Sequence, residues 1–309
     1  MPIRVARSPH NPIIHPGSDE TILGNINGPS LIRVPHWIEQ PLGAYYLYFA
    51  HHQGKFIRMA YADDVMGPYT VYTPGVLHIA DTSFERHIAS PDVHVEDEAR
   101  VIRMFYHGNG FRGERPDDIM QNTCLAESPD GVGFVSEHVC LGPSYMRVWQ
   151  WETTYYGFGG GGDRCLWRTK DSHRLFERGP VLEIDGESFT DYSDSHIVRM
   201  RHPGIDLVGH ELHVYYSNVG DCPERIKRTT VDLRGDWRHW RGSGVNEVLR
   251  TEVDYEGFEQ PNEPSAGGAS HEPVHQLRDP YVFNEDGRRY LVYSVAGEKG
   301  LGIAELTEA

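Results

Sequence analysis

The sequence predicts an all-β fold, a five-bladed β-propeller, on three observations. A short polar signal opens an apolar strand several times along the chain, and each time an aromatic-rich strand follows and ends in a small or histidine-bearing loop. The composition, with 33 Gly, 20 Pro and 11% aromatic residues in 309, suits many short strands joined by tight turns. The C-terminal repeat has room for only three strands, and a ring completed by the N-terminus explains this deficit.

The first two repeats each predict four strands. The first opens at Asn27-Gly-Pro and the second at Ser90-Pro-Asp, where acidic or glycine-containing turns separate the strands. The expected strands are 30–37, 44–52, 56–64 and 70–79 in the first repeat, and 92–97, 99–108, 121–131 and 133–142 in the second.

The remaining repeats complete the ring. A degenerate copy predicts strands at 145–151, 153–162, 164–171 and 176–184; the copy opening at Ser193-Asp-Ser-His predicts 197–202, 211–219, 225–233 and 237–244; and the copy opening at Arg278-Asp-Pro predicts 281–286, 289–295 and 301–308. The segment 3–14 is expected to supply the missing outer strand, so that residues 1–309 form one propeller domain. A β-sandwich is the alternative, but it accounts for neither the repeated signal nor the missing strand.

Net charge, cysteine spacing and the lack of long apolar segments limit the partners and the location that the sequence predicts. A formal net charge of −16 repels phosphate backbones and anionic lipid surfaces, so neither nucleic acid nor a membrane is an expected partner. Cys124, Cys140, Cys165 and Cys222 lack paired spacing and are expected to be reduced thiols. No signal-peptide pattern or apolar run of membrane-spanning length occurs, which predicts a cytoplasmic protein. The oligomeric state is left open.

A propeller brings the starts of its inner strands together with the loops that follow the second strands. The polar residues expected to converge at that face are Asn27, His51, His52, Asp92, His107, Asn109, Tyr145, Asp163, Arg164, Asp194, His196, Asp221, Glu224, Arg225, Asp279, Glu298 and Lys299. Glu152 falls in a turn at the opposite face and is excluded. His271-Glu-Pro-Val-His275 matches a zinc motif on paper, but Pro273 argues against the helix that such a motif needs.

Three segments carry a resemblance to a known family: SPDVHV (90–95), LRDPYVF (277–283) and YYLYFAHHQGKFIRMAYADDVMGPY (45–69). Together they resemble the five-bladed glycosidases of glycoside hydrolase family 43 and its relatives, families 32, 62, 117 and 130. These families use two carboxyl groups across the substrate and a further Asp that orients sugar hydroxyls.

The resemblance implies roles for particular residues. Asp92 and Asp279 look like catalytic or orienting carboxylates, whereas Asn27 occupies the first-blade position where family 43 usually places its base. His196 is the expected proton donor, as a histidine is thought to be in family 117, with Asp194 near enough to hold its tautomer. Glu224 is the competing acid. Substrate contacts are expected from Asn27, His51, His107, Asp194, Glu224, Arg225 and Arg278.

The predicted function is hydrolysis of a small sugar or oligosaccharide, exo-acting, by acid and base groups in the central funnel. No cofactor is required by this interpretation. His51, His107 and His196 form a possible divalent metal site, for calcium or a transition metal. This site motivates a first alternative, a metal- or histidine-dependent lyase or other non-hydrolytic enzyme, and the second alternative is a carbohydrate-binding propeller without catalysis.

Overall fold

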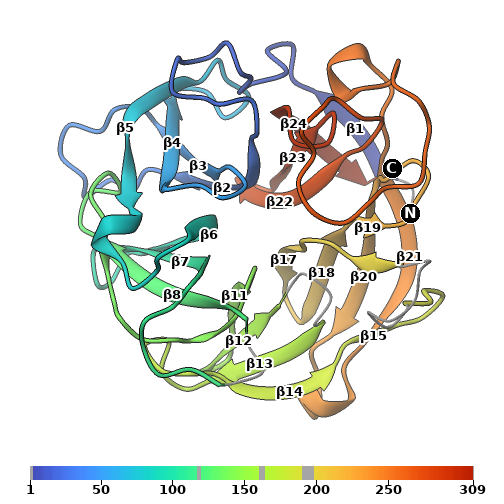
Figure 1. Cartoon of the computed structure of the whole chain (residues 1–309). Coiled ribbons are helices and arrows are strands. Elements are labelled where there is room, and N and C mark those ends of the chain that lie inside the picture. Colours follow the sequence, from blue (N-terminus) through green and yellow to red (C-terminus); the bar gives the residue numbers. More distant parts are fainter. Residues whose placement is uncertain (1–2, 117–119, 160–163, 190–197, 309) are drawn as a thin grey trace.

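The computed structural model describes residues 3–116, 120–159, 164–189 and 198–308. Their antiparallel sheets are arranged as blades around a central axis (Figure 1), called the channel below, into which side chains project. The strands closest to the channel are β2 (Asn27–Arg33), β6 (His87–Glu96), β11 (Arg147–Trp151), β17 (Gly204–Val208) and β22 (Arg278–Glu285). The predicted five-bladed propeller is confirmed.

The first three blades follow the predicted order from the channel outward. Blade 1 continues with β3 (Tyr45–Ala50), β4 (Phe56–Ala62) and β5 (Thr70–His78); blade 2 with β7 (Val101–Asn109), β8 (Gln121–Ser128), β9 (Val135–Ser136) and β10 (Gly142–Pro143); and blade 3 with β12 (Thr154–Phe158), β13 (Cys165–Thr169) and β14 (Glu177–Val181). In blade 2, both β9 and β10 pair with β8, so its outer edge is shared by two short strands.

Blade 4 corrects the predicted strands at two places. It continues with β18 (Glu211–Tyr216), β20 (Ile226–Asp232) and β21 (Arg241–Leu249), and β21 also pairs in parallel with β15 (Glu183–Ile184). The inner strand is β17 rather than 197–202, because the ladder to β18 starts only after Pro203 and closes through a turn at Gly209, where φ is +60°. Residues 199–200 instead form β16 (Arg199–Met200), which pairs with β19 (Asn218–Val219). Residues 237–239 form a 3-10 helix, so the outer strand begins at Arg241.

Blade 5 is closed by the N-terminal strand, as predicted. It continues from β22 with β23 (Arg288–Val295) and β24 (Gly300–Glu308), and β1 (Ile3–Arg7) pairs with β24 in the register Ile3↔Glu308 to Arg7↔Ala304. Arg7 strengthens the closure because its guanidinium donates to both oxygens of the buried Glu256 carboxylate. The two labelled ends of the chain accordingly lie side by side in Figure 1.

The apolar core is divided among the interfaces between neighbouring blades. Alternation along the strands produces this division, since successive side chains point to opposite faces of a sheet. Tyr46 and Tyr48 of β3 pack toward Tyr106 of blade 2, whereas Leu47 and Phe49 pack toward blade 5. Equivalent clusters join blades 2 and 3, 3 and 4, and 4 and 5. Packing on both faces holds each blade in place around the channel.

A bulge near the start of the inner strand recurs in three blades. The pairing register shifts at Gly28-Pro29, Ser90-Pro91 and Asp279-Pro280. In each case the residue before proline has a positive φ: 58° at Gly28, 46° at Ser90 and 49° at Asp279. Proline cannot donate to the ladder and a bulge re-aims the adjacent side chain, so these positions turn toward the channel.

Candidate functional site

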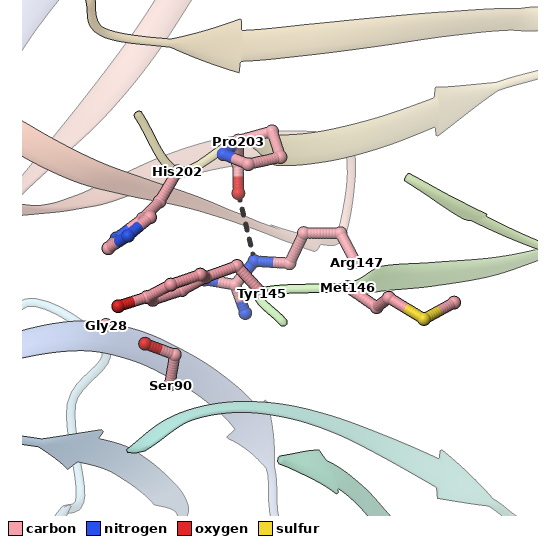
Figure 2. A pocket seen from close by; sticks show the side chains of 7 residues that line it. All are labelled: Gly28, Ser90, Tyr145, Met146, Arg147, His202 and Pro203. Carbon is pink, nitrogen blue, oxygen red and sulfur yellow. Dashed lines mark hydrogen bonds between the residues drawn. The ribbon is translucent and has the colours of Figure 1, made fainter. Parts of the chain in front are cut away.

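One position from each blade meets at the end of the channel. In blades 1, 2, 4 and 5 it is the residue before proline, and in blade 3 the corresponding residue is Tyr145, which also has a positive φ of 57° and is followed by Met146. The five residues are Gly28, Ser90, Tyr145, His202 and Asp279. Gly28, Ser90, Tyr145 and His202 line a narrow pocket with Met146, Arg147 and Pro203 (Figure 2). Backbone strain at three non-glycine positions fits a functional site.

A histidine–carboxylate pair lies at this pocket. His202 Nδ1 is 2.5 Å from Asp279 Oδ1, and the hydroxyl of Ser294 donates to Oδ2 of the same carboxylate at 3.3 Å. Burial alone would raise the pKa of Asp279, but the charges of His202, Arg201 and Arg278 outweigh it and hold the pKa well below its usual range. Asp279 is therefore an anion in close contact with the imidazole of His202, and the contact is one of charge and proximity, because neither His202 Nδ1 nor Asp279 Oδ1 has a hydrogen bond of good geometry among the described residues.

Aromatic stacking extends this pair across the pocket. The ring of Tyr145 stacks on His202, with centroids 3.5 Å apart, and its other neighbour is His107, at 3.9 Å. In Figure 2, Tyr145 lies between His202 on one side and Gly28 and Ser90 on the other. Burial and the charges of Asp279 and Glu298 raise the pKa of Tyr145, so its hydroxyl keeps its proton.

Two buried carboxylates beside Asp279 are each bound by an arginine. Both oxygens of Glu224 accept from Arg201, at 2.7 and 2.9 Å, and Ser217 also donates to Glu224. Arg278 donates to Glu298 at 3.1 Å and lies 3.6 Å from Glu224. Because their oxygens are occupied by these bonds, Glu224 and Glu298 are suited to holding the site together rather than to giving up protons.

Glu298 connects this network to blade 1. Its Oε2 accepts from Asn25 at 2.5 Å and from Asn27 at 3.4 Å, and His52 Nδ1 is 3.5 Å away. Burial would raise the pKa of Glu298, but the His52 and Arg278 contacts lower it overall. Asn27 is 4% exposed, and its Oδ1 has no hydrogen-bond partner among the described residues.

Three histidines of blades 1 and 2, His51, His87 and His107, have lowered pKa values and are neutral. His107 is 1% exposed, burial places its pKa well below the usual value, and neither ring nitrogen has a hydrogen-bond partner among the described residues. Burial also lowers the pKa of His87, whose ring lies edge-on to His107. Burial and the charge of Arg58 lower the pKa of His51 to about 4. His51 Nδ1 and both ring nitrogens of His107 have no hydrogen-bond partner among the described residues, so they can hydrogen-bond a neutral polar ligand.

Asp92 lies two residues beyond the pocket position of its strand. One oxygen accepts from the backbone of Val148 at 2.8 Å and contacts His94 Nε2 at 2.9 Å, and the other accepts from Arg147 at 3.3 Å. It is 2% exposed. Ser90, rather than Asp92, is the blade 2 equivalent of Asp279, because the repeats align on their prolines. The geometry thus gives Asp92 a supporting position below the pocket.

Alignment on proline also moves the pocket position of blade 1 from Asn27 to the next residue. The equivalent of Asp279 there is Gly28, and a Cβ at Gly28 would approach Ser90 Oγ to 2.7 Å and its Cα to 2.9 Å. Neither Asn27 nor Gly28 supplies the carboxyl group that family 43 usually has in this blade. The close approach of blades 1 and 2 leaves no room for a side chain at position 28.

The other predicted residues are placed as follows. Arg225 lies away from the pocket, since it pairs with Glu247 on β21 at 2.9 Å and with Asp221. Asp194 and His196 lie outside the described residues. Within the described ranges, no three His, Cys, Asp or Glu side chains are grouped so as to hold a metal ion. His51 and His107 thus have no third ligand there, and the proposed partner His196 is not described.

The sequence interpretation missed Arg201, His202 and Arg147. The available signal was the dipeptide His202-Pro203, which matches Gly28-Pro29, Ser90-Pro91 and Asp279-Pro280 when the repeats are aligned on proline.

Around His271 and His275 the chain forms no helix, in agreement with the exclusion of a zinc motif. None of the helices in the described part of the chain is long and apolar enough to cross a membrane.

Comparisons with solved structures define the class of fold. A GH43_1 enzyme from Xanthomonas citri is 16% identical with a TM-score of 0.61, covering 93% of this chain and 89% of that one. A GH43 β-xylosidase/α-arabinofuranosidase from a compost microbial metagenome is 16% identical with a TM-score of 0.59, covering 93% and 91%. A glycosyl hydrolase from Bacteroides ovatus is 11% identical with a TM-score of 0.65, covering 97% and 92%. The fold is that of a family 43-like propeller.

A sequence relative defines the family more closely. The "Uncharacterized protein R118" of Acanthamoeba polyphaga mimivirus is 35% identical over an alignment 332 positions long, gaps included, which covers 98% of this chain and 90% of that protein. The chain belongs to the family of this mimivirus protein. No family model matches the sequence.

Proposed function

We propose that the protein is a glycoside hydrolase in which His202, oriented by Asp279, transfers the proton. The 2.5 Å contact between His202 Nδ1 and Asp279 Oδ1 at the channel pocket is the observation that carries this proposal. A carboxylate on Nδ1 fixes the tautomer and leaves Nε2 for the substrate. The family 43-like fold and the xylotriose in the solved metagenome enzyme suggest a xylose- or arabinose-containing oligosaccharide.

The proposed reaction uses His202 twice. In its protonated form, the imidazole donates its Nε2 proton to the glycosidic oxygen as the bond to the anomeric carbon breaks. The neutral imidazole then accepts a proton from the water that adds to this carbon, which regenerates the starting state. Asp279 stays ionised throughout and stabilises the charged imidazole, while Tyr145 supports the ring by stacking.

We propose an exo mode of action. Arg147 and Met146 lie among the lining residues, and the Arg147 guanidinium hydrogen-bonds to the backbone of Pro203 beside them (Figure 2). Because these buried side chains fill the space beside His202, we propose that one terminal sugar is bound and released there.

The test compares His202→Asn and Asp279→Asn with the unmodified protein on 4-nitrophenyl glycosides and xylo- and arabino-oligosaccharides. We expect each variant to lose about 10²–10⁴-fold in kcat/KM, the usual contribution of a positioned proton donor. His173→Gln is the matched control, because His173 contacts Glu137 at 2.6 Å in an equivalent pair outside the pocket. Full turnover by His202→Asn would overturn the assignment.

A second candidate is a polysaccharide lyase, favoured by the lack of a carboxyl side chain at Gly28. Hydrolysis by the usual mechanism places a carboxyl group on each side of the scissile bond, whereas β-elimination needs a base and an acid such as histidine and tyrosine. His202 and Tyr145 provide both groups side by side. An unsaturated, ultraviolet-absorbing product would identify a lyase, and tight sugar binding with neither product would identify a carbohydrate-binding propeller.

A further inference from the structure

Arg147 crosses the channel axis and contacts every other blade. It follows Tyr145 and Met146 at the start of β11, in the blade that lacks the proline found at this place in the other four. Arg147 is 4% exposed. An arginine is seldom this deeply buried unless its donors and its charge are satisfied.

The guanidinium satisfies its donors on the backbone of three blades. Nη2 donates to Pro29 O at 3.1 Å in blade 1, Nη1 to Pro91 O at 2.8 Å in blade 2, and Nε to Pro203 O at 3.0 Å in blade 4. Blade 5 contributes the ring of Tyr281, whose centroid is 5.2 Å from Cζ. The planar fork of arginine suits such divergent acceptors, whereas the single ammonium of lysine does not.

These acceptors are available because the bulges interrupt the strand ladders. Residues 28–29 and 90–91 fall within register shifts, and Pro203 precedes the first pair of β17. A buried carbonyl without a donor destabilises the folded state, so three converging proline carbonyls favour one shared donor. Asp92, at 3.3 Å from Nη1, supplies the compensating negative charge.

We propose that Arg147 is a positioning residue that fixes the pocket by holding the backbone beside its lining residues. Each carbonyl that it binds belongs to the proline directly after a pocket residue, namely Gly28, Ser90 or His202. Movement of Pro203 would move His202 relative to Asp279, which comes from a different blade. Arg147, which belongs to blade 3, thus sets the geometry of the histidine–carboxylate pair formed by blades 4 and 5. The inference rests on the proposed function only for its consequence on turnover.

The first test measures geometry without requiring catalysis. In the full chain, the imidazole NMR signals of His202 are assigned by their disappearance in His202→Asn and then compared in Arg147→Met. We expect these signals to shift or broaden in Arg147→Met. Arg228→Met is the matched control, because Arg228 is also buried and paired, with Glu308, but lies in a groove remote from the pocket. Unchanged His202 signals in folded Arg147→Met would overturn the proposal.

Arg147→Lys provides a second variant that preserves the charge beside Asp92. We expect it to fold and still to shift the His202 signals, because one ammonium group cannot replace three directed N–H bonds. Unchanged signals in Arg147→Lys would contradict the proposal even if Arg147→Met failed to fold. Methylguanidinium, added to Arg147→Ala at millimolar concentration, should restore the signals, whereas methylammonium should not.

Turnover gives a separate readout. Misplacement of a reacting group by about 1 Å can cost about 10²-fold in rate, so Arg147→Lys should lower kcat by about 10–100-fold on any accepted glycoside. If His202 signals shift while no glycoside is turned over by the unmodified protein, the positioning role stands and the proposed hydrolase function fails. If turnover is present and unaffected by Arg147→Lys, the positioning role fails.

Discussion

The two sides of the pocket use polar residues in opposite ways. Toward blades 4 and 5, Arg201, Glu224, Arg278 and Glu298 bind one another, and nearly every charged atom has a partner. Toward blades 2 and 3, His107 is buried and neutral, and neither of its ring nitrogens has a partner among the described residues. The charged side is therefore a rigid support, whereas the neutral side has hydrogen-bonding capacity left for a ligand.

The largest effect is a predicted loss of stability when the charged side of the pocket is altered. Glu224→Gln leaves the buried Arg201 guanidinium without its countercharge, and breaking such a pair costs about 3–5 kcal/mol of unfolding free energy. Urea unfolding at neutral pH measures this loss. Glu177→Gln is the control, because Glu177 pairs with Arg168 at the surface and its loss should cost no more than about 1 kcal/mol. Equal losses of unfolding free energy in the two variants would show that the buried Arg201–Glu224 pair stabilises the fold no more than a surface pair does.

The second largest effect is expected where blades 1 and 2 approach each other, at Gly28 and Ser90. Gly28→Ala introduces a Cβ against Ser90 at a positive φ and should destabilise the protein by about 2–3 kcal/mol, through overpacking and backbone strain. Ser90→Gly in the same chain removes the overlapping atoms Oγ and Cβ and should recover part of that loss. Thermal unfolding of the two single variants and the double variant gives the coupling, and strict additivity would contradict the steric explanation.

A smaller effect concerns pH and the neutral histidines. His51 has a pKa near 4 in the folded protein and near 6.5 when unfolded, so the unfolded chain binds more protons between these values. Stability is therefore complete above about pH 6.5 and falls as the pH is lowered toward 4. After allowance for the solvent near this half-buried ring, the loss is about 2 kcal/mol. His51→Gln should flatten unfolding free energy across this window, and an unchanged slope would refute the prediction.

The smallest stability effect should have the opposite sign. His107→Met removes two buried nitrogens that have no partner in the described part of the chain, and it should leave stability unchanged or raise it by about 1 kcal/mol. The same change should weaken binding of an accepted sugar several-fold, measured by calorimetry, because the ligand loses its hydrogen-bond partner. A variant that is less stable and binds the sugar as well as before would show that His107 stabilises the fold rather than binding the ligand.

The fold was predictable because blade formation depends on local patterns. Alternating residues such as those of 45–50, turn glycines and a three-stranded last repeat all appear directly in the sequence. The inner strand of blade 4 was misplaced because His202-Pro203 was not recognised as a repeat signal. Proline alignment would have moved the strand to 204–208 and placed His202 beside Asp279.

The site was only partly predictable because its contacts join distant blades. Asp279, Glu224 and Arg278 were expected near the pocket, but their pairing with Arg201 and His202 depends on how blades 4 and 5 pack. Asp92 was expected in the pocket because it is the carboxylate nearest the repeat signal, yet the bulge at Ser90-Pro91 moves the pocket position two residues upstream. Arg147 carries no motif, since its acceptors are backbone atoms.

The pairing of β1 with β24 affects how this chain must fold during synthesis. Residues 3–7 are synthesised long before residues 300–308, which form their partner strand. Until those residues emerge, β1 has no neighbour to pair with and blade 5 exposes an open edge, which favours contacts between nascent chains. Completion of the propeller therefore waits for the synthesis of residues 300–308, and proteolysis or chaperone capture of residues 3–7 should be greatest just before these residues pair.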